Sequence, residues 1–511
     1  MLVKVFGSAV FGVEATTITV EVNIDNGIGY HLVGLPDSAI KESSYRIAAA
    51  LKNNQYQFPG KKITVNMAPA DLRKEGSAYD LTLAIGILAA SAQIKSDTVS
   101  QYVIMGELSL DGGLQPIKGA LSIAIKAKEE GFLGLILPYQ NVKEAAIVEG
   151  LDVYGVENVA QVIQFFDGKL DLLPTKIDTT EEFHKTLDFP EHDFSDVKGQ
   201  ESIKRCMEIA AAGGHNIILI GPPGSGKTML AKRLPSILPP MTIREALETT
   251  KIHSVAGKTK DVGLMAQRPF RSPHHTASSV SLVGGGSYPQ PGEISLAHNG
   301  VLFLDELPEF KREVLEVMRQ PLEDREVTIS RAKFTITYPS SFMLVASMNP
   351  SPGGYFNDPN APVTSSPMEM QRYLSKISGP LLDRIDIHIE VTPVPFEKLT
   401  ETQKAESSAA IRERVTQARA IQSVRFENFE NMHYNAQMSS KLIREFCILD
   451  DVSLQLLKTA MERLNLSARA YDRILKVART IADLESTATI ASHHIAEAIQ
   501  YRSLDREGWL G

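Results

Sequence analysis

A glycine-rich run that ends in a lysine and a threonine has the residue types needed to bind nucleotide phosphates. It fits the phosphate-binding loop G-x-x-x-x-G-K-[ST], and its residues are Gly221, Pro222, Pro223, Gly224, Ser225, Gly226, Lys227 and Thr228. Glycines let backbone N–H groups turn toward the phosphates, and a following helix adds the positive end of its dipole. We expect Lys227 to contact the β- and γ-phosphates of ATP and Thr228 to ligate Mg²⁺.

Two adjacent carboxylates further along the chain supply the second half of this chemistry. Asp305 and Glu306 follow the apolar residues 301–304, which are typical of a buried strand. We expect Asp305 to hold Mg²⁺ and Glu306 to polarise the attacking water. Such a pair alone is more often the solvated end of a strand. Because a phosphate-binding loop precedes it, the pair predicts a site that hydrolyses nucleoside triphosphates.

The residues beside the loop are predicted to form the elements that position it. Residues 216–220 are apolar and β-branched, which favours a buried strand before the loop. Residues 229–234 are predicted to begin a helix after it, and residues 201–212 to form an amphipathic helix. This strand–loop–helix order is the context that the motif requires.

Length and composition limit the class of protein. A chain of 511 residues is too long for one core, so two to four domains are expected. Because the formal net charge is −8, nucleic acid would have to meet a local basic surface. No apolar run approaches the roughly 20 residues of a membrane span, and the N-terminus lacks a signal-peptide pattern. Cys206 and Cys447 cannot build a disulfide framework, so a cytoplasmic protein without membrane contact is expected.

The first 166 residues alternate strand-like and helix-like segments, which predicts an α+β or α/β domain. Strands are predicted at 16–24, 62–68, 102–110 and 133–137, and helices at 37–53, 79–92 and 120–130, with Asp37 as the N-cap of the first helix. Residues 167–192 are polar with little periodicity and are predicted to be a linker. From about 397 the chain is predicted to be helical.

Three blocks of this front part resemble the catalytic domain of Lon protease, which has a ribosomal-S5-like fold. They span residues 74–81, 106–117 and 131–138. Ser77 lies near the position of the Lon nucleophile, but Leu121 stands where the Lon lysine would fall, and Lys118 is the alternative as a shifted partner. Without a base the serine is not activated. We therefore expect a Lon-like fold without protease chemistry, used for assembly or for DNA contact.

The rest of the chain resembles an AAA+ ATPase of the magnesium-chelatase/MCM branch. The blocks at 271–277, 282–286, 291–298 and 300–310 are similar to the YifB/ComM family, and the resemblance covers nearly the whole chain. It implies an α/β fold with a Lon-like domain (1–166), the linker (167–192), an AAA+ core with a parallel sheet (193–396) and a helical lid (397–511). The family is described as a hexameric helicase that acts in DNA branch migration during natural transformation.

The same resemblance assigns roles to polar residues after other strands. Asn349 matches sensor 1, where an amide contacts the γ-phosphate or the attacking water. Arg384 matches the arginine finger, which reaches the nucleotide of a neighbouring subunit and implies a homo-oligomer. Arg469 matches sensor 2, with Arg473 as the alternative.

The sequence gives little sign of a bound metal other than Mg²⁺. Many relatives carry four cysteines between sensor 1 and the finger, but this chain has none there, so no zinc is expected. Two histidine pairs, His274–His275 and His493–His494, are the other candidates. Because adjacent histidines on a strand point to opposite faces, we expect neither pair to hold a metal.

Two segments are candidates for DNA contact. Residues 327–337 are predicted to form a hairpin with Arg331 and Lys333 at its tip, directly before sensor 1. Each phosphate contact there would add salt dependence. The second candidate is the insert from 253 to 288, which carries Arg268 and Arg271. A hairpin with two basic residues is, however, often only a solvated turn.

Four functions remain open from the sequence. They are a DNA-translocating hexameric motor, a magnesium-chelatase motor subunit, an ATP-dependent protease and a non-catalytic assembly module. The intact nucleotide motifs argue against the last, and the missing lysine argues against the protease. Between the first two, the Lon-like front domain favours the DNA motor, because chelatase motor subunits lack that domain.

Overall fold

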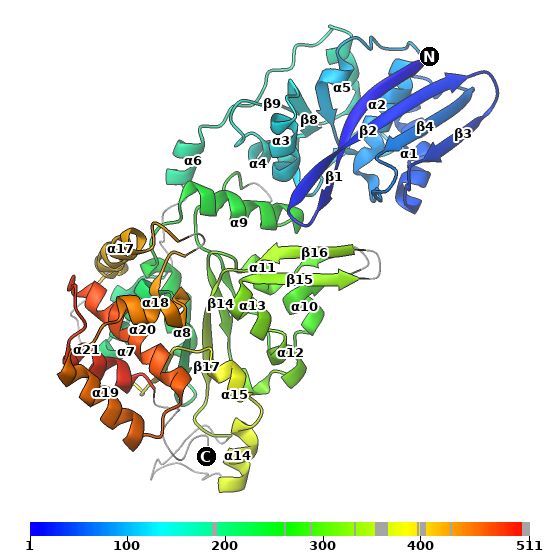
Figure 1. Cartoon of the computed structure of the whole chain (residues 1–511). Helices are drawn as coiled ribbons and strands as arrows, with labels where there is room; N and C mark the ends of the chain where they lie inside the picture. Colours follow the sequence, from blue (N-terminus) through cyan, green and yellow to red (C-terminus); the bar gives the residue numbers. More distant parts are fainter. Residues whose placement is uncertain are drawn as a thin grey trace. The chain divides into compact units, whose positions relative to one another are not determined.

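The computed structural model describes residues 1–185, 192–259, 262–286, 289–331, 334–352, 366–395, 398, 405–429 and 432–502. It divides into two compact units (Figure 1). The first unit contains residues 1–187 and 242–266, and the second contains residues 188–241 and 267–511. The chain therefore enters the second unit, returns to the first for one segment, and goes back.

The first unit is built on a mixed seven-stranded sheet in the order β3-β4-β2-β1-β5-β8-β9. The central pairs β1–β2 and β2–β4 are antiparallel, and the outer pairs are parallel. The strands are β1 (Leu2–Phe11), β2 (Glu14–Asp25), β3 (Gly29–Val33), β4 (Lys62–Ala68), β5 (Tyr102–Ile104), β8 (Gly134–Pro138) and β9 (Asp152–Val156). The alternating burial of β2 puts every second side chain into the core, as its period of two predicts.

Helices cover this sheet. They are α1 (Ser38–Asn53), α2 (Asp80–Ala90), α3 (Ala120–Glu129), α4 (Val142–Ala145), α5 (Val159–Phe166), α6 (Thr179–Lys185) and α9 (Ile243–Val255). As predicted, Asp37 caps α1, and its carboxylate accepts a hydrogen bond from Ile40 N at 2.9 Å. Helix α2 packs on β1 and β2 and is buried all round, which its uninterrupted apolar sequence explains.

Two predictions for this unit were wrong. The single strand at 102–110 is broken at Gly106 into β5 and a short hairpin of β6 (Glu107–Leu108) and β7 (Leu114–Gln115). The segment at 167–192 contains a helix, α6, rather than a plain linker. Asp178 caps α6 through Thr180 N (2.9 Å), and Thr179 Oγ1 donates to Ile147 O (3.0 Å). A polar composition therefore concealed a capped helix that packs on its own unit.

The second unit has a five-stranded, fully parallel sheet in the order β11-β14-β17-β10-β18. The strands are β10 (Ile217–Ile220), β11 (Phe270–Arg271), β14 (Val301–Leu304), β17 (Met343–Met348) and β18 (Ile387–Glu390). Two hairpins stand outside this sheet, formed by β12 (Gly284–Gly285) with β13 (Gln290–Pro291) and by β15 (Glu326–Arg331) with β16 (Phe334–Pro339). The carboxyl ends of parallel strands lie at one edge, where ligands bind in such sheets.

Helices fill the remainder of this unit. The core section contains α7 (Glu201–Gly213), α8 (Lys227–Ile237), α10 (Ser279–Val283), α11 (Glu293–Leu296), α12 (Arg312–Glu316), α13 (Arg319–Asp324), α14 (Pro367–Leu374) and α15 (Gly379–Leu382). The C-terminal section contains α17 (Ser408–Arg425), α18 (Ser440–Phe446), α19 (Asp451–Arg463), α20 (Ala468–Leu484) and α21 (Ser492–Gln500). These C-terminal helices share one hydrophobic core with the sheet and with α7 and α8.

The predicted fold class is confirmed: an N-terminal mixed-sheet part, a parallel-sheet core and a helical C-terminal region. Among the described residues, no helix is both long and apolar enough to cross a lipid bilayer.

Candidate nucleotide site

The phosphate-binding loop lies between β10 and α8, where the sequence predicted it. Gly224 and Gly226 have φ angles of +78° and +91°, a region that side chains with a Cβ rarely adopt. A Cβ on Gly221 would lie 2.3 Å from the carbonyl oxygen of Val391, so only glycine fits beside β18. These three glycines let the loop turn back on the N-terminus of α8, which can bind an anion.

Lys227 and the predicted sensor 1 residue Asn349 are brought together. The ammonium group of Lys227 donates to Asn349 Oδ1 at 3.2 Å and to the carbonyls of Gly221 (2.6 Å) and Pro222 (2.9 Å). Burial lowers the pKa of Lys227, while the nearby charges of Asp305 and Glu306 raise it. Asn349 directly follows β17, which is the strand between β10 and β14 in the sheet. A phosphate between Lys227 and Asn349 would meet a cation and an amide.

Thr228 and Asp305 lie side by side and fit a hydrated Mg²⁺. The hydroxyl of Thr228 donates to Asp305 Oδ2 at 2.8 Å, and both are oxygen ligands of the kind that Mg²⁺ prefers. Ser347 on β17 donates to the other carboxylate oxygen, Asp305 Oδ1. The sequence analysis missed Ser347, although its place in the strand beside β14 gave a signal for it. It fixes the orientation of the carboxylate.

Glu306 has a strained backbone and an unexpected partner. Its φ of 53° lies in the left-handed region, which non-glycine residues enter mainly at functional sites. Its Oε2 lies 3.4 Å from Nδ1 of His275, a residue of the loop after β11. From the sequence, His275 belongs to a block that resembles the family and is not expected to hold a metal. The structure places it instead against the carboxylate that is predicted to polarise water.

Gln200 is a second residue that the sequence analysis missed. Its side-chain amide donates to Ser225 O in the loop and to Thr392 O after β18, each at 3.1 Å. It therefore ties the phosphate-binding loop to the neighbouring strand. Gln200 adopts a left-handed backbone conformation (φ 58°) at the start of α7. The sequence alone does not indicate this conformation.

The predicted arginines gather in a separate cavity of about 250 Å³. Arg384, Arg469 and Arg473 line it, and the residues that line it include none from the phosphate-binding loop. Arg384 pairs with Glu323, and Arg469 pairs with Asp383. Arg473 instead pairs at 2.7 Å with Asp386, which is 1% exposed. The finger and both sensor 2 candidates therefore share one surface of the same chain.

The DNA candidates fall into two groups. The predicted hairpin exists as β15 and β16, with Arg331 opposite Phe334 in the strand register. Lys333 and the side chain of Arg331 lie outside the described residues. Arg268 donates to Pro239 O (2.7 Å) and Asn299 O (2.8 Å), and Arg271 forms an ion pair with Glu293 (2.6 Å). Both guanidinium groups therefore interact with other residues of this protein.

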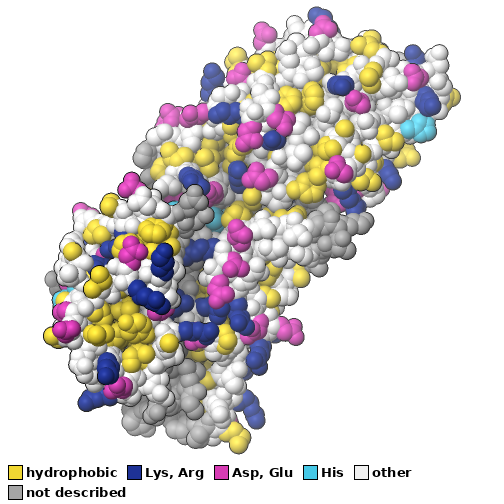
Figure 2. Space-filling view, viewed as in Figure 1, with side chains coloured by type: hydrophobic (Ala, Val, Ile, Leu, Met, Phe, Trp, Pro, Cys, Tyr) yellow, Lys and Arg dark blue, Asp and Glu magenta, His cyan; other side chains and the backbone are white. Residues whose placement is uncertain are grey.

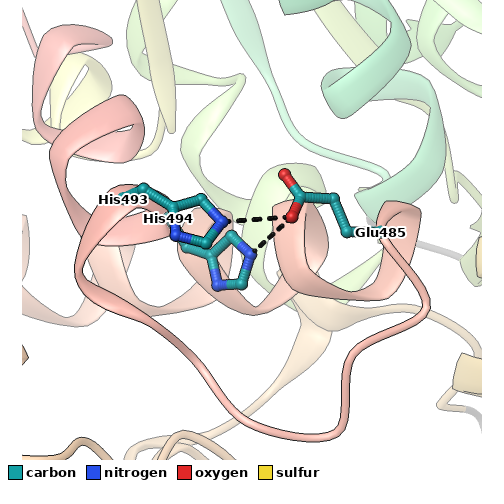
Figure 3. Close-up of side chains that lie close together, drawn as sticks. All are labelled: Glu485, His493 and His494. Atoms are coloured by element: carbon teal, nitrogen blue, oxygen red, sulfur yellow. Dashed lines mark hydrogen bonds and ion pairs between the residues drawn. The ribbon is translucent and has the colours of Figure 1, made fainter.

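The second histidine pair is arranged differently from the prediction. His493 and His494 lie at the start of α21, and both Nε2 atoms are 3.1 Å from Glu485 Oε2 (Figure 3). The argument from opposite faces was wrong, because these residues are in a helix and not in a strand. Ala491 N donates to Nδ1 of His494 (2.9 Å), which puts the proton of the neutral ring on Nε2. A metal ion at that nitrogen would have to displace this proton.

The Lon-like candidates lie in the first unit. Ser77 forms part of a single helical turn that leads into α2, and Leu121 is fully buried in α3. The side chain of Lys118 lies against Gly257, because a Cβ built on that glycine would be 3.2 Å from Lys118 Cε. Lys118 therefore packs on the segment that returns from the second unit.

The surface charge is mixed, in keeping with the overall composition. On the face visible in Figure 2, several Lys and Arg side chains gather on the second unit, with Asp and Glu beside them. Basic character is therefore local rather than general, as the net charge of −8 requires.

Known protein families match three segments of the chain. The family described as magnesium chelatase, subunit ChlI, matches residues 193–399, and its C-terminal part matches residues 405–502. The family described as subunit ChlI of Mg-chelatase matches residues 20–141.

Two relatives match over nearly their whole length, and a third matches over about a quarter of its length. Competence protein ComM of Haemophilus influenzae is 46% identical over 510 residues, which cover 99% of this chain and 98% of ComM. YifB of Escherichia coli is 45% identical over 500 residues, which cover 98% of this chain and 96% of YifB. Lon protease 2 of Bacillus subtilis is 28% identical over 150 residues, which cover 28% of this chain and 27% of that protein.

Proposed function

The chain belongs to the YifB/ComM family of magnesium-chelatase-like AAA+ ATPases, and from that premise we propose that it is an ATP-driven motor on DNA. In this proposal it forms a ring of identical subunits, most simply a hexamer, translocates on DNA and promotes branch migration during natural transformation and recombination. The observation that carries the proposal is the full-length similarity to a competence protein together with the assembled nucleotide site.

The residues of the site divide the work of ATP hydrolysis. The non-proline residues of the loop 221–228 bind the phosphates through backbone N–H groups, and Lys227 neutralises their charge. Thr228 and Asp305 would hold Mg²⁺, which would supply charge stabilisation there. Glu306 accepts a proton from the attacking water, and Asn349 orients that water or the γ-phosphate. His275 sets where the Glu306 carboxylate points.

The arginine cavity supports a site that is shared between subunits. Arg384 and Arg469 are paired with the carboxylates of Glu323 and Asp383, and not with residues of their own phosphate-binding loop. Glu323 is 58% and Asp383 32% exposed, so solvent reaches both carboxylates and a phosphate can replace them. We infer that both arginines act on the nucleotide of a neighbouring subunit, which makes assembly necessary for hydrolysis.

The first test is the ATPase rate of the wild type and of Glu306→Gln, with and without branched DNA, over a series of salt concentrations. The proposal expects DNA to stimulate the wild type, with stimulation falling as salt rises because phosphate contacts release counterions. Glu306→Gln keeps the shape but loses the base, so its rate should fall by about 100-fold or more.

One outcome would favour the alternative function. If the wild type hydrolyses ATP and no DNA changes its rate, the DNA motor loses its support. A magnesium-chelatase-type motor subunit or another protein remodeller would then be preferred, and the match of three segments to chelatase subunit ChlI is the observation behind that choice.

A further inference from the structure

A buried carboxylate, Asp386, lies two residues after the predicted finger, Arg384. Asp386 is 1% exposed and accepts hydrogen bonds from Arg473 Nη1 (2.7 Å), His215 Nδ1 (3.2 Å) and Asn216 N (3.3 Å). Although burial raises it, the charge of Arg473 and the hydrogen bond from His215 bring the pKa of Asp386 below its usual value. The carboxylate is therefore ionised and held from three sides at neutral pH.

His215 connects this carboxylate to helix α20. Its Nε2 lies 2.8 Å from Thr480 Oγ1, and the ring is fully buried. Burial lowers the pKa of His215 although Asp386 raises it, so the ring is neutral at pH 7. Nδ1–H then donates to Asp386, and Nε2 faces the hydroxyl of Thr480, which also lies 2.9 Å from Lys476 O. The order Asp–His–hydroxyl is that of a hydrolase triad, but all three groups are buried, so no substrate reaches Thr480.

The same cluster also holds the backbone of the finger. The amide of Asn216 donates to Arg384 O at 2.9 Å and accepts from Leu344 N at 2.9 Å. Leu344 belongs to β17, which leads to Asn349, and Asn216 directly precedes β10, which leads to the phosphate-binding loop. The cluster thus joins the finger to the starts of both nucleotide-site strands.

The ion pairs of Arg384 and Arg469 differ from that of Arg473 in how easily the carboxylate partner can be replaced. The partners of Arg384 and Arg469 are 58% and 32% exposed, whereas Asp386, the partner of Arg473, is 1% exposed. A buried ionised carboxylate cannot leave its arginine without a large desolvation cost. Arg473 lies one helical turn after Arg469 on α20, so fixing Arg473 also fixes the helix that carries Arg469.

We infer that Asp386, with His215 as its buried partner, is a positioning residue that presents Arg384 and Arg469 together to the nucleotide of a neighbouring subunit. Arg473 then serves as the anchor of α20 rather than as sensor 2. This inference rests on the proposed function, because it requires a shared site. It also predicts the effect of substituting Asp386. The substituted subunit should no longer present Arg384 and Arg469 correctly to its neighbour, but its own phosphate-binding loop should still bind ATP.

Mixing of variants tests the inference directly. Asp386→Asn alone should lose at least about ten-fold in ATPase rate while keeping the wild-type affinity for ATP, which fluorescent nucleotide binding measures. Lys227→Ala cannot bind the phosphates but still carries an intact finger. A one-to-one mixture of the two should regain hydrolysis at about a quarter of the interfaces. At these interfaces the phosphate-binding loop comes from an Asp386→Asn subunit and the arginines come from a Lys227→Ala subunit, so both are intact.

A parallel mixture separates this inference from the proposed function. Arg384→Ala mixed with Lys227→Ala should also regain hydrolysis if the site is shared. If that mixture is active and the Asp386→Asn mixture stays inactive, the positioning role is overturned. If both mixtures stay inactive, the shared site itself fails and the inference fails with it. Wild-type activity of Asp386→Asn alone also overturns the inference.

Three further variants separate loss of positioning from loss of folding. Asp483→Asn removes a carboxylate that is equally buried and is bonded to Arg425 and Arg479, but is not bonded to the finger segment. It should lower the unfolding temperature and yet keep the ATPase rate of the folded protein. His215→Asn keeps a donor near the position of Nδ1 and should retain more activity than His215→Leu. Equal loss in these last two variants contradicts the role of His215.

Discussion

Lys476 carries an ammonium group into the interior of the helical region. It is 8% exposed, it donates to Ala436 O at 3.0 Å, and it lines the arginine cavity. Burial and the charge of Arg473 lower its pKa to about 8, although Asp386 and Asp472 raise it and Arg325 lowers it further. The unfolded chain returns the group to its ordinary pKa of 10.5, so folding is linked to pH here.

The sign of this linkage follows from the lowered pKa. Above pH 10.5 both states are neutral at this position. As the pH falls toward 8, the unfolded state takes up a proton and the folded state does not, so stability is lost by about 1.4 kcal/mol per pH unit, or roughly 3 kcal/mol in all. Below pH 8 both states are charged and the difference is constant.

We therefore expect the free energy of unfolding of the wild type to rise between pH 8 and 10 relative to Lys476→Met. Urea unfolding of both proteins at each pH measures this difference, and the subtraction removes the other titrating groups. A constant difference across this range contradicts the lowered pKa. Lys458→Met, which removes an exposed ammonium group of α19, is the control for the loss of one lysine.

At the scale of single residues, sequence predicted what local motifs encode. Lys227, Thr228, Asp305 and Asn349 come together because each follows a strand of the same parallel sheet. The cluster of His215, Asp386 and Thr480 could not be predicted, because its members lie 171 and 265 positions apart and each is ordinary in its own segment. His275 was considered and rejected as a metal ligand and was given no other role, since sequence does not show that its side chain lies beside Glu306.

Among the elements, the hairpin β15–β16 has two unlike faces. Val327, Ile329, Ile336 and Tyr338 are buried, while the opposite face pairs Thr328 with Thr337 (3.3 Å) and Ser330 with Thr335 (3.4 Å) across the strands. The hydroxyl of Tyr338 donates to Pro289 O at 2.8 Å and fixes the hairpin to its base. One face therefore anchors the hairpin, and the opposite face presents hydroxyl groups.

We predict that Arg331→Ser combined with Lys333→Ser weakens DNA stimulation of the ATPase, expressed relative to the variant's own rate without DNA. Two lost phosphate contacts should reduce the slope of log affinity against log salt by about 1.5. The matched control is Lys458→Ser with Arg463→Ser on α19, which removes the same charge from an exposed helix. An equal effect of the control pair would show that only net charge matters.

Element boundaries were predicted best where composition and caps agree. The strands β4 and β14 have the predicted bounds, and α1 begins after the predicted N-cap. Helix α9 was not predicted, although Thr242 and Glu245 form a capping box: Thr242 Oγ1 accepts from Glu245 N (3.1 Å), and Glu245 Oε2 accepts from Thr242 N (2.8 Å). The capping signal was present in the sequence. The sequence did not show which hydrophobic core α9 would join, because amphipathicity indicates that one face of a helix is buried but not what it packs against.

For the whole molecule, the main finding is that residues 242–266 belong to the first unit although they lie within the ATPase sequence. Helix α9 packs on α3, Gly119 N donates to Ser254 O at 3.2 Å, and Thr259 donates to the buried carboxylate of Glu144. Burial raises the pKa of Glu144, although hydrogen bonds from Thr259 and Asn141 lower it. Arg268 directly follows the segment 242–266 and belongs to the second unit. Its guanidinium group donates to Pro239 O, just after α8, and to Asn299 O, just before β14.

We therefore predict that residues 1–187 alone form a weaker fold than the same residues joined by a flexible linker to 242–266. Ile252, Val255 and Leu264 are buried in the segment, and at about 1.5–3 kcal/mol each their burial contributes on the order of 5 kcal/mol, an upper estimate. That equals much of the stability of a typical domain. Thermal unfolding should place the short fragment about 10 °C or more below the joined one.

The joined fragment with Ile252→Asp and Val255→Asp is the control, because it keeps the length and removes the apolar contact. It should unfold near the temperature of the short fragment. If residues 1–187 alone unfold at the same temperature as the joined fragment, the segment 242–266 does not stabilise the first unit. If they do not, a segment of the ATPase sequence completes the fold of the front domain, and residues 238–241 are the covalent connection between α8 and that segment.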